Sequence, residues 1–208
     1  MGVITEISSQ KNKKRVNIFV DGVFVSGLSF ESAVKNGLKT GLSITEQKLK
    51  SIIEESETQD CFTSGLNFLS KSAKTKHEII QKLLQKGFER NIIELAVKKL
   101  EEYHYINDEL YAMNFVKSYT GKSKRELQYK MKNKGIADEI INKVLVQIPE
   151  DHDFENAISY SNKYLKAKAF NEKTKNNLFA ALVRRGFSLD IIYIVIENIK
   201  VGGNDDWC

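Results

Sequence analysis

The sequence predicts a mainly α-helical protein in which tandem three-helix repeats form an elongated, curved array behind a small N-terminal region of β-hairpin and helix. Three observations lead to this prediction. A pattern of glycine, hydroxyl and apolar residues recurs three times between residues 61 and 199. Two β-prone segments flank an Asp-Gly pair near the N-terminus, and the 208 residues contain one proline, Pro149. Because proline removes a backbone donor, its scarcity favours long uninterrupted helices.

The N-terminal segment has the residue types of a small antiparallel sheet. Residues 3–7, 15–20 and 23–25 are rich in valine, isoleucine and phenylalanine, and Asp21-Gly22 lies between the second and third segments. An Asp-Gly pair between two β-prone segments favours a type I′ hairpin, because both central residues of that turn have positive φ. We therefore expect a hairpin at this pair.

Helical spacing replaces the strand pattern from Ser29 onward. A first helix should contain Phe30 and stop near Gly37, and a second should run from a Thr45 cap to Glu57. Cys61 is expected at the start of a third helix, which belongs to the first repeat.

Three glycines mark the repeat. Gly87, Gly135 and Gly186 lie 48 and 51 residues apart, and each stands between a basic residue and an apolar one. A glycine at the end of a helical pattern indicates a C′ residue in the left-handed conformation. Each copy should therefore contain a helix that ends at its glycine and a second helix that follows.

Other positions of the repeat coincide as well. A capping hydroxyl stands twelve residues before each glycine, and Glu78 and Glu126 follow the first two by three residues, as in a capping box. The hydroxyl residues are Thr75, Ser123 and Thr174. Apolar residues recur eight and four positions before the glycine, namely Ile79, Leu127 and Leu178, then Leu83, Met131 and Leu182. This agreement over three copies predicts one packing scheme used three times.

A further helix should precede the capped helix in each copy, and Asp108 is expected to cap the one in the second copy. This organisation predicts an N-terminal region with hairpin and two helices, three repeats and a tail. The expected ranges are 1–58, then 59–107, 108–149 and 150–200 for the repeats, and 201–208 for the tail, which carries Trp207 and Cys208.

The sequence favours a binding protein over an enzyme, and we expect no cofactor. It has neither a Walker loop nor a dinucleotide-binding glycine fingerprint. The acidic stretch around His152 meets no metal-ligand spacing, and a charged linker is the expected reading. Cys61 and Cys208 form no disulfide framework, which favours a reducing cytoplasm. No segment approaches the length of a membrane span or has the pattern of a signal peptide.

Positive charge is concentrated in the middle of the chain. The net charge is +5, and residues 109–149 hold eight basic and four acidic side chains. A basic segment suggests a polyanionic partner, either nucleic acid or an acidic protein surface. A solvated lysine-rich surface would give the same composition, and cations in the last turn of a helix also stabilise its dipole. We expect Arg125 and Lys132 to point away from the helix core and Lys130 and Lys134 to flank it.

The candidate contact residues lie at the ends of the glycine-terminated helices and along the middle one. They are Lys86, Lys124, Arg125, Lys130, Lys132, Lys134, Arg184 and Arg185.

Several of these segments resemble the RecX family, which regulates the RecA recombinase. The residues 76–88 are similar to the family's first repeat, and 105–112 to its inter-repeat segment, although the family usually has an acidic pair where this chain has Asn107-Asp108. The residues 130–136 and 182–188 are similar to later repeats, and 15–22 to an extension of members from Gram-positive bacteria.

The resemblance implies a modular helical protein that lies in the groove of the RecA–DNA filament. It implies inhibition of strand exchange, ATP hydrolysis and coprotease activity, and hence a role in recombination, DNA repair and the SOS response. The eight cations would then contact RecA or the filament DNA, and direct DNA binding would be weak and salt-sensitive. No repeat shows a sustained heptad seam, so we expect a monomer. Two alternatives remain open from the residues themselves: a helix-turn-helix-like DNA-binding regulator, and a helical-repeat adaptor for another acidic protein.

Overall fold

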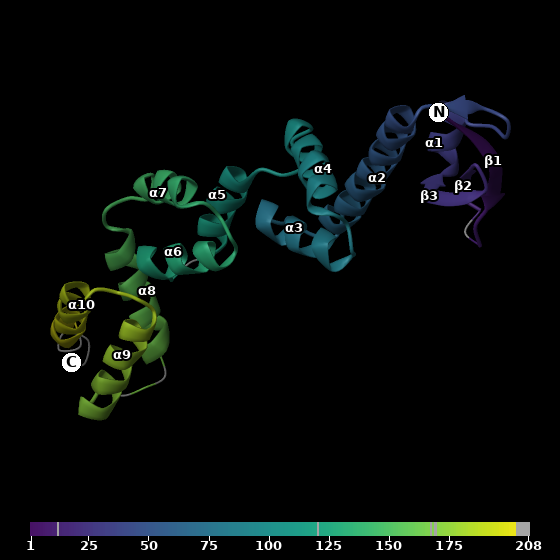
Figure 1. Cartoon of the computed structure of the whole chain (residues 1–208). Coiled ribbons are helices and arrows are strands. Elements are labelled where there is room, and N and C mark those ends of the chain that lie inside the picture. The colour runs from purple at the N-terminus through teal and green to yellow at the C-terminus, as the bar shows by residue number, and fades with distance from the viewer. Residues whose placement is uncertain (12, 120, 167, 169, 203–208) are drawn as a thin grey trace. The chain divides into compact units, whose positions relative to one another are not determined.

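The structure is a computed structural model that describes residues 1–11, 13–119, 121–166, 168 and 170–202. Its elements group into two units (Figure 1). The first unit contains residues 1–74 and 78–106, and the second contains 75–77 and the chain from 107 onward. Trp207 and Cys208 lie outside the described residues. No helix in the described part is long and apolar enough to cross a membrane.

A four-stranded antiparallel sheet opens the first unit. Its strands are β1 (Gly2–Ser9), β2 (Arg15–Val20), β3 (Val23–Ser29) and the short β4 (Ser43–Ile44), in the order β3-β2-β1-β4. Asp21 and Gly22 have φ values of 50° and 79°, which confirms the predicted hairpin turn. The sequence did not predict β4, because two residues carry no recognisable strand pattern.

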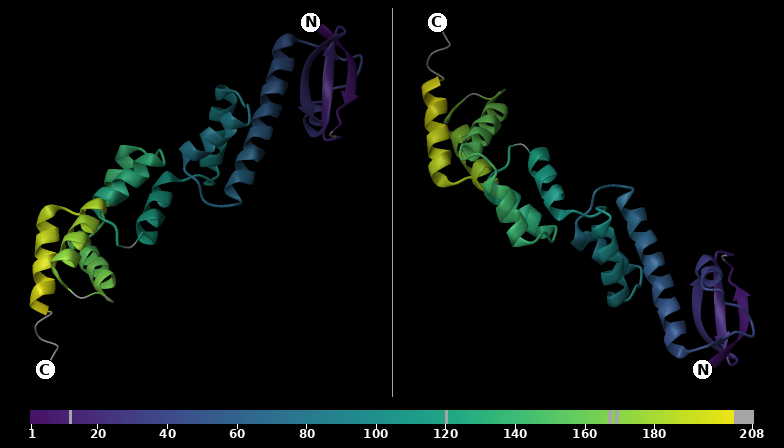
Figure 2. Two further views of the ribbon diagram at one scale, coloured as in Figure 1. Left: turned by 90° about the horizontal axis from the view of Figure 1, so that it is seen from below. Right: turned by 90° about the horizontal axis from the view of Figure 1, so that it is seen from above.

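Helix α1 (Phe30–Lys35) is short, and α2 (Glu46–Leu69) is the longest helix of the first unit. Thr45 caps α2 as predicted, since its side chain accepts a hydrogen bond from Lys48 N at 3.2 Å. We expected one helix to end at Glu57 and another to start near Cys61, and this expectation was wrong. Cys61 lies inside α2, and the expected break between residues 58 and 59 falls within the same helix, which Figure 2 shows as one continuous ribbon.

The first repeat uses the second half of α2 together with α3 (Lys76–Gln85) and α4 (Arg90–Glu102). Its core is apolar, and Cys61, Ile79, Leu83 and Leu100 are fully buried there. A separate apolar core, which includes Leu49 and other residues, lies between the sheet and the first half of α2. One helix therefore supplies side chains to two cores.

The second unit contains two further three-helix repeats. Repeat 2 consists of α5 (Asp108–Ser118), α6 (Lys124–Asn133) and α7 (Asp138–Val146). Repeat 3 consists of α8 (His152–Leu165), α9 (Glu172–Arg184) and α10 (Leu189–Gly202). Each has its own core, and the predicted apolar positions are fully buried, namely Leu127 and Met131 in repeat 2 and Leu178 and Leu182 in repeat 3.

The three marker glycines end their helices in the same way. Gly87, Gly135 and Gly186 have φ values of 87°, 73° and 79°, which confirms the predicted left-handed conformation. In the first copy, Phe88 N donates to Leu83 O at 3.3 Å and Gly87 N donates to Leu84 O at 2.9 Å. The equivalent pairs recur in the other two copies. This pattern is the Schellman motif, and it satisfies the last carbonyl groups of each helix.

The predicted caps were correct in part. Ser123 caps α6, with its Oγ accepting from Glu126 N at 3.1 Å. Asp108 was wrongly expected to cap α5: Asn107 takes that position and accepts from Leu110 N at 2.8 Å.

Thr174 was also wrongly expected to cap its helix. Helix α9 begins earlier, at Glu172, because Asn171 accepts from Thr174 N at 2.9 Å. Thr174 therefore lies within the first turn of the helix.

Candidate interaction surface

The side chains of helix α6 differ in burial according to the face of the helix on which they lie. Leu127 and Met131 are fully buried, and Arg125 and Lys132 are exposed. Lys130 is half-buried between these two classes. The predicted orientation of the helix is therefore confirmed, and it follows from the helical period.

Two of the candidate cations have a structural role at the start of α6 and the end of α9. The Lys124 ammonium donates to Ile148 O at 3.1 Å. The Arg185 guanidinium lies 3.9 Å from the centre of the Tyr160 ring, in a cation–π contact. These contacts hold helices of the second unit together, so these two cations are less available to a partner.

Two others lie over aromatic rings of α5 and its C-terminal end. Lys130 Nζ is 5.7 Å from the Tyr119 ring and 3.8 Å from the Glu126 carboxylate. Lys134 Nζ is 5.5 Å from the Tyr111 ring. Both ammonium groups thus already contact side chains of their own repeat.

The remaining candidates are exposed. Lys132 pairs with Asp138 at 2.9 Å, an exposed ion pair of the kind that contributes about 0–1 kcal/mol and is easily exchanged. Lys86, in the first unit, lies over the Phe68 ring at 5.1 Å. Within the described residues, Arg125 and Arg184 have neither an ion pair nor a hydrogen bond through their side chains.

Sequence reasoning missed Tyr129, which is 66% exposed on α6. It lies four residues after Arg125 and three before Lys132, so all three share one face of the helix. The helical spacing could have identified it. We call Arg125, Tyr129 and Lys132 of α6, with Arg184 of α9, the basic surface. Its cation and aromatic side chains suit contact with carboxylates, phosphates or planar rings.

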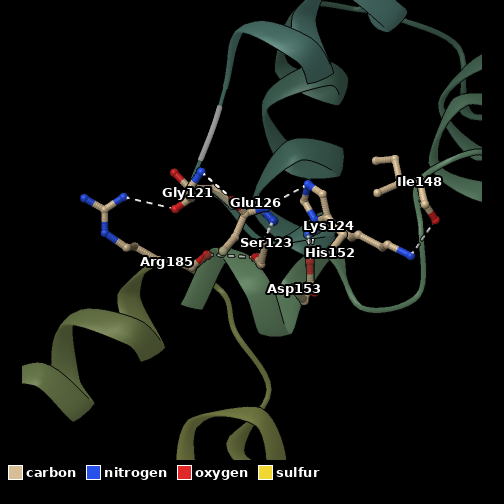
Figure 3. Close-up of polar contacts among 9 residues, drawn as sticks. Gly121, Ser123, Lys124, Glu126, Ile148, His152, Asp153 and Arg185 are labelled. Atoms are coloured by element: carbon tan, nitrogen blue, oxygen red, sulfur yellow. Dashed lines mark hydrogen bonds and ion pairs between the residues drawn. The ribbon is translucent and has the colours of Figure 1, made fainter. Parts of the chain in front are cut away.

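Repeats 2 and 3 meet where α6 begins and α9 ends (Figure 3). Ser123, which is fully buried, donates through Oγ to Arg185 O at 2.8 Å. The backbone N–H of Lys124 donates to Asp153 Oδ1 at 2.8 Å. A Cβ atom built on Gly186 would lie 2.7 Å from Ser123 Oγ, so any larger residue there would displace this hydroxyl. We call Ser123, Asp153 and Gly186 the repeat joint.

Polar side chains of α8 surround this joint. His152 Nδ1 lies 3.0 Å from Asp153 Oδ1, and its Nε2 lies 2.9 Å from Asn156 Nδ2. Asn156 Oδ1 in turn accepts from Gly121 N at 2.9 Å. His152 with its proton on Nδ1 satisfies both neighbours. Within the described residues no group of acidic, histidine or cysteine side chains is arranged to hold a metal ion.

Three family models match this chain in order. They are the regulatory protein RecX N-terminal domain over residues 2–45, the first three-helix domain of RecX over 61–100, and the second over 107–145.

Curated relatives match nearly the whole of this chain. The regulatory protein RecX of Clostridium perfringens is 31% identical, over 96% of this chain and 97% of the relative. That of Clostridium beijerinckii is 29% identical over the whole of both chains. That of Bacillus mycoides is 33% identical, over 99% of this chain and 80% of the relative.

Two solved structures share the fold. A crystal structure of regulatory protein RecX aligns with a TM-score of 0.68 at 22% identity, covering 95% of this chain and 100% of that one. A crystal structure of RecX from Lactobacillus salivarius aligns with a TM-score of 0.61 at 23% identity, covering 70% and 97%.

Proposed function

The chain belongs to the RecX family of regulatory proteins, and we propose that it binds the RecA recombinase filament and mostly inhibits recombination, ATP hydrolysis and coprotease activity. Family membership across the N-terminal domain and two three-helix domains is the observation that carries this proposal. Regulation then proceeds by binding in the cytoplasm, and catalysis by this chain is not required.

The basic surface supports a polyanionic partner. Arg125 and Arg184 are exposed, and the Lys132–Asp138 pair can exchange its acidic partner for another. Arginine forms bidentate contacts with both carboxylate and phosphate, so an acidic RecA surface and filament DNA fit the same side chains. We expect RecA to be the main partner and direct DNA binding to be weak.

The experiment that tests the proposed function is RecA ATPase on single-stranded DNA, with this protein added after filaments have formed. Inhibition well below one copy per RecA is the expected result, because one bound copy would span several protomers and block filament growth. Inhibition only at amounts that coat the DNA would indicate competition for nucleic acid. Full activity at every ratio, with RecA from the same source, would overturn the proposal.

Charge reversal tests the contact residues. The variant Arg125→Glu, Lys132→Glu and Arg184→Glu should weaken filament binding by roughly tenfold or more, because it places like charges against each other across the interface. The matched control is Lys163→Glu, Lys166→Glu and Lys173→Glu, which makes the same change in net charge at exposed positions of repeat 3. Equal loss in both variants would show that net charge, and not the basic surface, governs binding.

The two alternatives predict different results. A helix-turn-helix-like regulator would bind duplex DNA sequence-specifically, with a discrimination that survives salt. An adaptor for another acidic protein would leave RecA unaffected. The tandem repeats favour an extended contact over the two-fold symmetric contact of a dimeric operator-binding protein.

A further inference from the structure

The hydroxyl of Ser123 makes two contacts at once. It accepts from Glu126 N at 3.1 Å, which caps α6, and it donates to Arg185 O at 2.8 Å, which links repeat 2 to repeat 3. A hydroxyl group can do both, because it has one proton and two lone pairs. Alanine at this position would lose both contacts and leave buried backbone groups without these partners.

Asp153 makes the reciprocal contact from repeat 3. Its carboxylate accepts from Lys124 N in the first turn of α6, where negative charge is stabilised by the helix dipole. Two hydrogen bonds in opposite directions and the close approach at Gly186 resist rotation about any one of the three contacts. The joint therefore fixes an orientation as well as a distance.

The same arrangement is present a second time within the second unit. Thr75, also fully buried, donates through Oγ1 to Lys134 O at 2.7 Å, and Lys76 N donates to Asp108 Oδ1 at 2.8 Å. A Cβ atom on Gly135 would lie 2.3 Å from His77 Cγ. A hydroxyl, an aspartate and a crowded glycine thus recur at equivalent positions, which identifies them as a rule of this repeat.

The positions that do not follow the rule are the first glycine and the last hydroxyl. A Cβ atom on Gly87 would meet no atom of the described residues within 4 Å. The Thr174 hydroxyl lies 2.9 Å from Asn171 Oδ1 of its own helix start. Among the described residues, the hydroxyl-to-carbonyl contact and the crowded glycine therefore occur together at Ser123 and at Thr75, and not at Thr174 or Gly87.

We propose that Ser123, Asp153 and Gly186 are positioning residues that lock repeat 3 onto repeat 2 and thereby set the spacing of the cations used for binding. Arg125 lies two residues after Ser123, and Arg184 lies two residues before Gly186. A Cβ atom on Gly186 would lie 3.7 Å from Arg125 Cβ. The lock thus joins the two backbone segments that carry these exposed arginines, one in each repeat. The part of this proposal that concerns the partner rests on the proposed function.

The lock can be measured without RecA. Spin labels at Val146→Cys in repeat 2 and Asn176→Cys in repeat 3 occupy exposed positions, in a Cys208→Ser background. Cys61 is fully buried and can stay. We expect a narrow distance distribution by pulsed electron paramagnetic resonance in this parent protein. Ser123→Ala and Asp153→Ala should each broaden the distribution, while circular dichroism shows that the helices are retained.

Two control variants separate the lock from general damage. Thr174→Ala removes a hydroxyl whose hydrogen bond among the described residues lies within its own helix start, and should leave the distribution narrow. Ser123→Thr should also leave it narrow, because threonine makes the equivalent contact at Thr75. A distribution as narrow in both Ser123→Ala and Asp153→Ala as in Thr174→Ala would overturn the lock.

The second arm measures affinity for RecA filaments. Because ordering two loosened repeats opposes binding, the two broadened variants should bind roughly tenfold more weakly, and the two controls should bind like the parent. Broadened distributions with parental affinity would overturn the positioning role while leaving the lock in place. If the parent itself fails to bind RecA, the proposed function fails, and the distance measurement still decides on the lock.

Discussion

The two units connect their parts by different means. In the first, α2 continues from the sheet into the first repeat, so that Leu49 packs on the sheet core and Cys61 on the repeat core. In the second, no helix continues from repeat 2 into repeat 3, because α7 and α8 are separated around Pro149. Polar contacts at Ser123 and Asp153 join these repeats instead. A continuous helix transmits orientation through its own backbone. Where the helix stops, the orientation has to be restored by contacts between residues far apart in the chain.

Glycine also serves a different purpose in each unit. Gly65 lies within α2, and a Cβ atom there would lie 2.7 Å from Leu100 Cδ1 of α4. This close approach is apolar, whereas Gly186 approaches the polar Ser123 hydroxyl. The first unit should therefore respond most strongly to changes in side-chain volume, and the second to loss of hydrogen bonds and backbone conformation.

The largest effect should come from Leu100→Ala. This fully buried side chain fills the core of the first repeat, and its truncation should lower the free energy of unfolding by about 2–5 kcal/mol, because it leaves a cavity. Urea unfolding followed by circular dichroism measures this change. Leu110→Ala is the control, since Leu110 is 54% exposed and its truncation should change stability by less than about 0.5 kcal/mol.

Gly65→Ala tests the close contact between α2 and Leu100 from the other side. Alone, it should destabilise by about 1–3 kcal/mol, because its methyl group overlaps Leu100. In the Leu100→Ala protein the overlap is removed, so the double variant should lose less than the sum of the single losses. Additive losses would show that Gly65 and Leu100 are not coupled.

Gly186→Ala and Gly87→Ala compare the units directly. Both place a side chain at positive φ, which costs about 1–2 kcal/mol in either case. Gly186→Ala should lose a further ~1 kcal/mol or more, because its methyl group also displaces Ser123. Equal losses in chemical unfolding would contradict a role for Gly186 beyond its backbone conformation.

The alkylation rate of Cys61 measures the opening of the first unit. Burial raises the pKa of its thiol to about 11, despite the opposing charge of Lys86. At pH 8 its alkylation in a Cys208→Ser background should be at least about a hundredfold slower than in the unfolded chain, because the thiolate is the reactive form. The rate should rise with pH towards 11, and Leu100→Ala should increase it at every pH. A rate equal to that of the unfolded chain would show that the α2 core is open.

The smallest change in stability is expected for substitution of Glu57 on α2. Burial raises the pKa of this carboxyl, and the negative charge of Glu89 adds to the rise. The folded state therefore holds the Glu57 proton more tightly than the unfolded state does. The stability gained from this tighter binding is present below the pKa of the unfolded state and is lost as the pH rises through the pKa of the folded state. Glu57→Gln should thus stabilise the protein at pH 7, by less than about 0.5 kcal/mol, and have no effect at pH 3. Thermal unfolding at the two pH values provides the measurement.

Local patterns in the sequence determined much of this fold. Asp21-Gly22 predicted the hairpin and Gly87 the end of its helix, because a positive φ is encoded by the residue that adopts it. The spacing of Leu127 and Met131 identified the buried face of α6, because the helical period places them on one side. The candidate cations were also recognisable from charge alone, but not their individual roles.

The tertiary structure alone decided the rest. It kept α2 continuous past Cys61, since packing on two cores overrides a weak local boundary. It directed Arg185 onto the Tyr160 ring and left Arg125 exposed. It also gave Ser123 a partner 62 residues away, at Arg185 O, whereas the hydroxyl of the similar residue Thr174 bonds, among the described residues, to Asn171 at its own helix start. A hydroxyl in a capping pattern looks the same in both places, because its second hydrogen bond depends on which repeat lies against it.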